Sequence, residues 1–249
     1  METIEYKVEK KLAVITLNRP DKMNAVNAKM LGELWQVFTD VRDNREVWGA
    51  IITGRGRAFC AGHDLTEPFS DAKPSFDDLY SLQTQIYKPM IAAVNGICLA
   101  QGGAMALASD IVVTSDQARF GWPQVKRGIS SISGPTMLAR RVPLNRAFEI
   151  LFTGEFISAQ QALELNLVNH VVPTEEVMPT AERIARKILE NAPLAVWAMK
   201  EATLRTLPLR PSEAYHVAGL FLKQIETTED AQEGLRAFRE KRAPVWKGK

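Results

Sequence analysis

Short runs of apolar residues alternate with a helical repeat near the start of the chain. Residues 12–17 form a β-branched run and residues 48–53 form a second, and residues that favour turns close each run. Between the two runs, Met30, Leu34 and Phe38 recur at the spacing of one helix face. The order strand, helix, strand predicts a mostly parallel sheet with crossover helices, so the fold class is α/β.

The same pattern continues and then changes in the second half of the chain. Residues 90–94 and 110–114 are predicted strands. From Asn145 onward, helical spacing dominates. Helices are predicted at residues 103–109, 158–164, 181–189, 194–205, 212–225 and 229–239. We therefore divide the chain into an α/β core, residues 1–190, and a C-terminal helical region, residues 191–249. Within the core, the segment 65–81 holds two prolines and mixed charges, which predicts a mobile loop over a cleft.

Composition excludes several classes of protein. The 249 residues can bury a large core in one domain, and the net charge of +2 does not indicate a nucleic-acid partner. The apolar stretches are shorter than the roughly 20 residues that span a membrane. The N-terminus has no apolar signal segment, and Cys60 and Cys98 do not indicate a disulfide framework, so a cytoplasmic location is expected. No metal site is predicted, because no second ligand pair accompanies Cys60 and His63.

Two glycine-containing turns follow predicted parallel strands and carry the candidate chemistry. Residues 57–65 follow the second strand and residues 95–104 the third. The ends of neighbouring parallel strands are the usual place for a ligand crevice, and free N–H groups at a helix start point into it. Two N–H groups that converge on one oxygen form an oxyanion hole. A Gly-Gly turn before a helix can also be only a turn, and neither segment has the spacing of a phosphate-binding motif.

Five segments, spread along nearly the whole chain, indicate a particular protein family. They are LNRPDKMNA at residues 17–25, FCAGHDL at 59–65, KPMIAAVNG at 88–96, FGWP at 120–123 and AFREKRAP at 237–244. In this order they resemble the signature segments of the enoyl-CoA hydratase/isomerase (crotonase) superfamily. The resemblance implies a spiral of ββα units with a C-terminal helical trimerisation region, and a homotrimer or homohexamer.

The resemblance also implies a substrate and a binding site. The substrate is an acyl-CoA thioester, so coenzyme A is part of the substrate and no separate cofactor is implied. The oxyanion donors correspond to the backbone N–H groups of His63 and Gln101, where the family has glycine at the second position. The coenzyme A contacts that it implies are Met23, Ala25, Ala61, His63, Asp64, Leu65 and Gly102.

The chain departs from the family at the groups that exchange protons. The two glutamates of the hydratases correspond to Ala104 and Gln124, and a third acidic position of some relatives corresponds to Ile132. Neither a methyl group nor a neutral amide transfers protons at ordinary pH, so weak hydration is expected. The turn at His63 resembles that of methylmalonyl-CoA-type decarboxylases, although the partner tyrosine there corresponds to a position near Ser131. His63 could bind a carboxylate or exchange a proton, or it could only line the coenzyme A channel.

Three functions therefore stay open. The first is an enzyme that stabilises an acyl-CoA enolate or tetrahedral oxyanion and so catalyses decarboxylation or thioester hydrolysis. The second is a catalytically silent acyl-CoA-binding subunit. The third is an enzyme for an aromatic or alicyclic acyl-CoA whose own groups supply the proton transfers. Ser130, Ser131 and Ser133 lie in a loop expected near the acyl group, but no base for a serine nucleophile is identifiable, and Trp122 is expected in the core.

Overall fold

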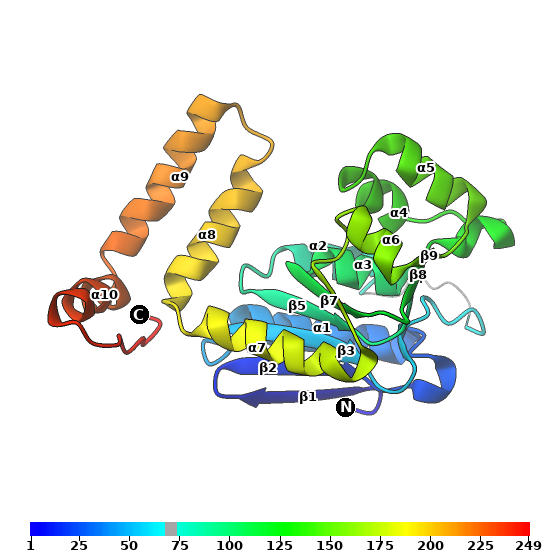
Figure 1. Cartoon of the computed structure of the whole chain (residues 1–249), viewed down its shortest axis with the longest axis horizontal. Coiled ribbons are helices and arrows are strands. Elements are labelled where there is room, and N and C mark those ends of the chain that lie inside the picture. The colour runs from blue at the N-terminus through cyan, green and yellow to red at the C-terminus, as the bar shows by residue number, and fades with distance from the viewer. Residues whose placement is uncertain (68–73) are drawn as a thin grey trace.

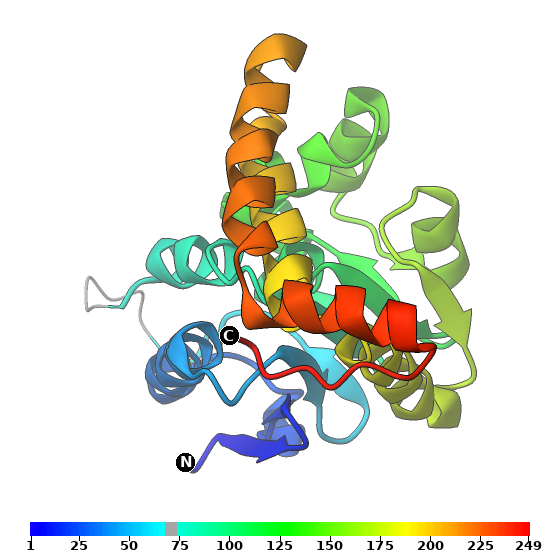
Figure 2. The same ribbon diagram turned by 90° about the vertical axis from the view of Figure 1, so that its left-hand side faces the viewer.

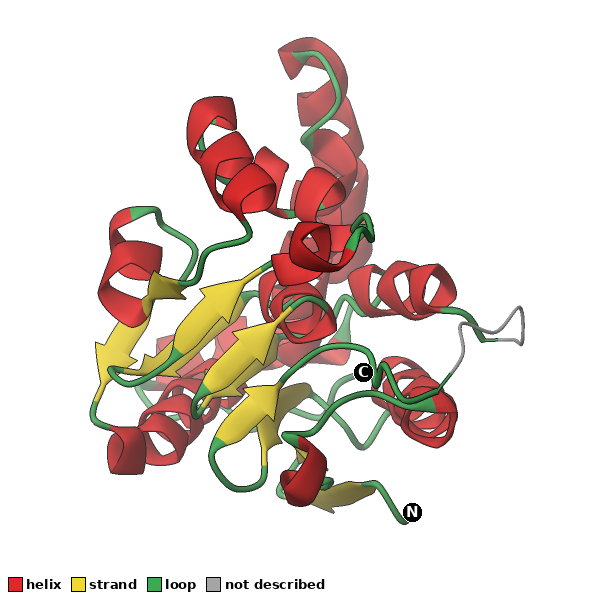
Figure 3. Ribbon diagram, turned by 90° about the vertical axis from the view of Figure 1, so that its right-hand side faces the viewer, coloured by secondary structure: helices red, strands yellow, loops and turns green. Residues whose placement is uncertain are grey.

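Two sheets form the centre of the computed structural model, which describes residues 1–67 and 74–249. The larger sheet has the order β1-β2-β3-β5-β7-β10 and is parallel from β2 onward, with β1 antiparallel to β2 (Figures 1 and 3). Its strands are β1 Ile4–Glu9, β2 Leu12–Leu17, β3 Gly49–Gly54, β5 Met90–Val94, β7 Ile111–Ser115 and β10 His170–Val172. The predicted α/β class and the four predicted strands are confirmed within one residue at each end, whereas β1 and β10 were not predicted.

A smaller sheet continues from the ends of the larger one. Its strands are β4 Ala58–Cys60, β6 Ile97–Leu99, β8 Arg119–Gly121 and β9 Ile157–Ser158. The strands β4, β6 and β8 each follow a strand of the larger sheet after a short turn. Gly96 shows how tight these turns are, because an added Cβ there would lie 2.1 Å from the carbonyl oxygen of Arg57. The chain therefore repeats a strand-turn-strand-helix unit, which brings two such turns together at one edge.

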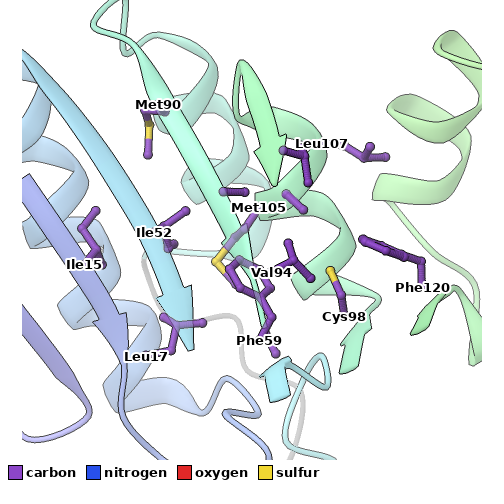
Figure 4. Close-up of a cluster of buried hydrophobic side chains, with 14 of the residues drawn as sticks. Ile15, Leu17, Ile52, Phe59, Met90, Val94, Cys98, Met105, Leu107 and Phe120 are labelled. Carbon is purple, nitrogen blue, oxygen red and sulfur yellow. The ribbon is translucent and has the colours of Figure 1, made fainter. Parts of the chain in front are cut away.

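Alternate residues of the central strands face opposite layers of helices. Ile51, Ile91 and Val113 pack against α7 (Val177–Leu189) on one face. On the other face, Ile52, Ala92 and their neighbours belong to a larger cluster that also includes residues of the smaller sheet and of helices α1 and α3. Figure 4 shows part of this cluster. The cluster anchors both sheets to one core, so the turns between them are held by buried side chains.

The helices of the core follow the predicted periodicity except α2 and α4, which were predicted to be loops. They are α1 Ala28–Asp43, α2 Phe76–Thr84, α3 Gln101–Ala108, α4 Ser133–Thr136, α5 Leu144–Thr153, α6 Ala159–Glu164 and α7 Val177–Leu189. Helix α2 begins within the segment 65–81, which was predicted to be a loop, and runs three residues beyond it. Ser75 caps α2 by accepting from the Asp78 N–H, and the Asp78 carboxylate accepts from the Ser75 N–H at 2.9 Å. Of that predicted loop, residues 68–73 lie outside the described residues.

The C-terminal helices stand apart from the sheets. Helices α8 (Pro193–Thr206) and α9 (Pro211–Glu226) form an antiparallel pair that projects from the core, and α10 (Glu229–Glu240) lies near the base of α8 (Figures 1 and 2). The base is fixed by Trp197 Nε1, which donates to the Trp48 carbonyl at 3.0 Å, and by Lys200, whose Nζ lies 2.7 Å from the Asp110 carboxylate. In the part of the chain that the structure describes, no helix is long and apolar enough to cross a membrane.

Candidate functional site

A pocket of about 740 Å³ lies beside the two glycine turns, bordered by α1, α2, the start of α3 and the segment 123–133. Of the residues selected from the sequence, those that line it are Ala61, His63, Leu65, Gln101, Gln124, Ile132 and the three loop serines. Those that do not line it are Met23, Ala25, Asp64, Gly102 and Ala104. The structure therefore brings both residues that carry the proposed oxyanion donors to one pocket, whereas several predicted coenzyme A contacts do not line it.

The first turn is fixed by the backbone of Val26. The Val26 N–H donates to the Gly62 carbonyl at 2.7 Å, and the Asp64 N–H donates to the Val26 carbonyl at 3.0 Å. In a parallel bridge of this kind, the residue between the two bonded ones directs its own N–H and C=O to the opposite side. The N–H of His63 therefore points away from Val26, on the side of α3 and the pocket.

The second turn carries unusual backbone angles at Ala100, not at Gln101. Gln101 is the first residue of α3, and the residue before it, Ala100, takes φ 51° and ψ −107°. This region is ordinarily occupied by glycine, and such a conformation costs on the order of 1–3 kcal/mol. Because Gln101 begins the helix, its N–H has no acceptor within the helix and lies at the positive end of the helix dipole.

The two turns are in direct contact. An added Cβ at Gly62 would lie 3.0 Å from the Ala100 Cβ and 3.3 Å from the Gln101 Oε1, and Gly62 has φ 106°. An added Cβ at Gly102 would lie 2.3 Å from the Cys60 carbonyl oxygen. The missing side chain of Gly102 allows α3 to approach the first turn, and its predicted contact with coenzyme A stays a prediction. The N–H groups of His63 and Gln101 thus come from touching turns, as an oxyanion hole requires.

Residues outside the pocket lining hold the first turn in place. The Asp64 carboxylate accepts hydrogen bonds from Thr66 and pairs with Arg19 at 2.9 Å, and these contacts lower the pKa of Asp64 to about 2. Arg19 also donates to the Ala25 carbonyl, and the Met23 carbonyl accepts from the Ala61 N–H at 3.0 Å. Met23, Ala25 and Asp64 therefore support the first turn through these contacts.

Ala104 and Gln124, which the resemblance matches to the hydratase glutamates, differ in their access to the pocket. Ala104 is fully buried in α3 and does not line the pocket. Gln124 lines it, and its buried Oε1 has no hydrogen-bond partner among the described residues. Three carboxylates line the pocket elsewhere, and each has a contact of its own. Glu67 accepts from the Ala28 N–H at 3.0 Å, Asp77 accepts from the Ser75 hydroxyl at 2.8 Å, and Glu155 pairs with Lys126.

Helix α2 adds two aromatic residues that the sequence analysis did not identify. Phe76 packs edge-on against the His63 ring, with centroids 5.3 Å apart, and Tyr80 also lines the pocket. Burial raises the pKa of Tyr80, so its hydroxyl stays protonated. The Ser75-x-x-Asp78 capping box was the sequence signal that could have revealed this helix. Asp77 and Tyr80 on α2 and His63 on the first turn are therefore pocket residues with ionisable side chains.

Other reactive groups near the pocket are inert or absent. Burial raises the pKa of the Cys60 thiol to about 12, so it is not a thiolate at neutral pH. Across residues 1–67 and 74–249, no group of three or more His, Cys, Asp or Glu side chains could hold a metal ion. The chemistry that remains combines two backbone N–H groups with the side chains of His63, Gln124 and Tyr80 and the three pocket carboxylates.

Comparison with known proteins identifies the family. Residues 7–249 match the family model described as enoyl-CoA hydratase/isomerase. The chain is 39% identical over 251 residues to a carnitinyl-CoA dehydratase of Proteus mirabilis, with 94% of each chain covered, and 38% identical over 260 residues to that of Citrobacter koseri, with 100% and 99% covered. Among solved structures, an enoyl-CoA hydratase/isomerase from Mycobacterium paratuberculosis superposes with a TM-score of 0.92 at 35% identity, covering 100% of this chain and 99% of that one. The chain belongs to the enoyl-CoA hydratase/isomerase family.

Proposed function

We propose that this chain binds an acyl-CoA thioester and stabilises the negative charge that develops on its carbonyl oxygen. The contact between the two turns carries the proposal, because it brings His63 and Gln101, the first residue of α3, to one pocket. Preorganised backbone donors of this kind are a large source of transition-state stabilisation in acyl chemistry. The donors suit an enolate as well as a tetrahedral oxyanion.

Decarboxylation or thioester hydrolysis fits the rest of the pocket better than efficient hydration. Hydration requires side chains that move protons to and from the α-carbon and water, whereas Ala104 is buried away from the pocket and Gln124 is a neutral amide. In decarboxylation, the bond from the α-carbon to the carboxylate breaks, carbon dioxide leaves, and the electron pair forms an enolate that water can protonate. The His63 imidazole, at the edge of the pocket, would orient the leaving carboxylate by a hydrogen bond.

Dehydration of a β-hydroxyacyl-CoA is the second candidate. The similar curated proteins are named carnitinyl-CoA dehydratases, and the buried Gln124 Oε1 lacks a hydrogen-bond donor among the described residues. A substrate hydroxyl or a water molecule could supply that donor, because buried acceptors are normally satisfied. In this case Gln124 would orient the hydroxyl, and another group would carry the proton.

One panel of substrates separates these functions. Malonyl-CoA, methylmalonyl-CoA, 3-hydroxybutyryl-CoA, crotonyl-CoA and acetyl-CoA are incubated with the protein, and the products are identified by mass spectrometry while binding is measured by calorimetry. Loss of carbon dioxide or release of free coenzyme A supports the main proposal, and loss of water supports the second. Binding without any product identifies a silent acyl-CoA-binding subunit, and no binding of any thioester contradicts the proposal altogether.

A further inference from the structure

The carbonyl oxygen of the strained residue Ala100 accepts hydrogen bonds from two donors. The Ala104 N–H lies 2.9 Å from the Ala100 carbonyl oxygen, as expected for a helix start, and the Ser133 Oγ lies 3.4 Å from it. The second donor comes from a different segment of the chain, at the beginning of α4. The same peptide group that presents its N–H at Gln101 is therefore held at its carbonyl end by Ser133.

Trp122 determines the direction of the Ser133 hydroxyl. The Trp122 Nε1 lies 3.0 Å from the Ser133 Oγ, and both side chains are nearly inaccessible to solvent, with exposed fractions of 1% and 2%. An indole N–H can only donate, so the Ser133 oxygen accepts from it and keeps its own O–H for another acceptor. That acceptor is the Ala100 carbonyl. The chain of donors thus runs in one direction, from Trp122 through Ser133 to the peptide of Ala100 and Gln101.

Packing also holds this series of hydrogen bonds against α3. An added Cβ at Gly103 would lie 2.8 Å from the Trp122 ring, so the ring rests directly on the first turn of the helix. Trp122 therefore touches α3 with its ring and fixes Ser133 with its N–H. A glycine at position 100 would adopt φ 51° without strain, but alanine at this position needs its surroundings to maintain the conformation.

We propose that Trp122 and Ser133 are positioning residues for the oxyanion hole, and that they hold the Ala100–Gln101 peptide so that the Gln101 N–H points at the thioester oxygen. A hydrogen bond to a peptide carbonyl also polarises the N–H of the same peptide, because chains of hydrogen bonds strengthen one another. This inference rests on the proposed acyl-CoA function. It assigns a role to Ser133 that requires no base and no covalent step.

The first test uses the protein without ligand. With glutamine residues labelled with ¹⁵N, backbone amide resonances of wild type, Ser133→Ala and Ser133→Thr are compared, the Gln101 peak being assigned by its loss in Gln101→Ala. We expect the Gln101 resonance to move in Ser133→Ala and to stay near its wild-type position in Ser133→Thr, which keeps the hydroxyl. A Gln101 resonance that stays at its wild-type position in Ser133→Ala would overturn the inference.

The second test measures the polarisation of a bound substrate analogue. The carbonyl stretching frequency of butyryl-CoA labelled with ¹³C at the thioester carbon is recorded by infrared difference spectroscopy. Binding to wild type should lower this frequency, and Ser133→Ala and Trp122→Phe should reduce the shift. Turnover of the substrate found with the panel should fall about tenfold in kcat in Ser133→Ala with little change in KM, less than the roughly 100-fold loss of a whole oxyanion donor.

A compensating change separates positioning from direct contact with the substrate. Because glycine adopts the backbone angles of Ala100 without help, Ala100→Gly added to Ser133→Ala should restore most of the frequency shift and of kcat. A direct contact between Ser133 and the acyl group would not be restored, and that result would overturn the inference. If wild type binds no butyryl-CoA while the Gln101 resonance still depends on Ser133, the proposed function fails and the positioning role stands.

Discussion

The two sides of the pocket are built on different principles. On one side, the turns at His63 and Gln101 offer backbone N–H groups, which are fixed by the contact of Gly62 with Ala100. On the other side, proton transfer depends on what side chain each position carries, and Gln124 carries none that ionises. A backbone donor survives a change of side chain, as from glycine to Gln101, whereas a proton donor does not. We therefore expect stabilisation of an oxyanion to tolerate substitutions in this pocket better than proton transfer does.

Removal of one backbone donor should give the largest effect. Gln101→Pro deletes the N–H at the first position of α3, a position where proline is normally tolerated in helices. We expect turnover of the identified substrate to fall by about 10²–10³-fold. Gln101→Ala is the matched control, because it removes the side chain and keeps the N–H. Equal losses in the two variants would mean that the side chain, and not the backbone, is the important group.

Supplying an acid on the other side of the pocket should give the next largest effect. Gln124→Glu places a carboxylate in the pocket, and crotonyl-CoA hydration should rise at least tenfold, since a positioned acid or base contributes about 10²–10⁴-fold. Hydration is followed by the loss of enoyl absorbance. Gln124→Leu, of similar size and without polarity, should give no increase. Ala104→Glu should instead lower the melting temperature, because Ala104 is fully buried and a carboxylate there would lose its hydration.

His63 contributes to both sides of the pocket. Its backbone N–H is one of the proposed oxyanion donors, and its ring is one of the side chains that could exchange a proton. His63→Ala keeps the backbone donor, so acetyl-CoA affinity should change little. Turnover of a malonyl-type CoA should fall at least tenfold, about 1.4 kcal/mol, if the ring orients the leaving carboxylate. His63→Phe keeps the packing against Phe76 and tests whether the loss comes from packing. Full turnover of His63→Ala would leave the ring as a lining of the pocket.

The support behind the first turn should give the smallest effect, and it should depend on pH. The pKa of Asp64 is about 2 in the folded chain and about 3.9 in an unfolded one. A lowered carboxyl pKa stabilises the fold above about pH 4, and this contribution is lost as the pH falls through about 2. Asp64→Asn should therefore lower the free energy of unfolding at pH 7 by on the order of 1 kcal/mol. Urea unfolding at several pH values measures it, and the difference between variant and wild type should shrink below pH 4.

Part of this architecture could be predicted from the amino-acid order, because some signals are local. The runs at β2, β3 and β5 are β-branched and unbroken, and the helix α1 has a clear repeat, so their positions agree with prediction. The strands β4, β6 and β8 are only three residues long and are defined by their partners in the smaller sheet. Three residues show no period, and their pairing depends on contacts distant in sequence.

The site follows the same division. The two turns could be located because their glycines and the resemblance mark them, and both do border one pocket. The angles of Ala100 could not be predicted, because they depend on support from Ser133, more than thirty residues away in the chain. Met23, Asp64 and Gly102 do not line this pocket, and that also depends on contacts between segments distant in the chain. The motifs therefore indicated which segments meet, and the structure shows which of their residues line the pocket.

We expect the projecting helix pair α8–α9 to make the stability of this protein depend on the association of several copies. Helix α9 buries no residue and α8 buries only Pro193, while Met199, Leu207 and Tyr215 are each more than 70% exposed. Apolar surface of this extent is typical of an interface, and we expect other copies of the chain to cover it, as in the predicted trimer. Association then adds a free energy that depends on protomer concentration. On dilution, amide hydrogens of α8 and α9 should exchange with solvent long before those of the central strands.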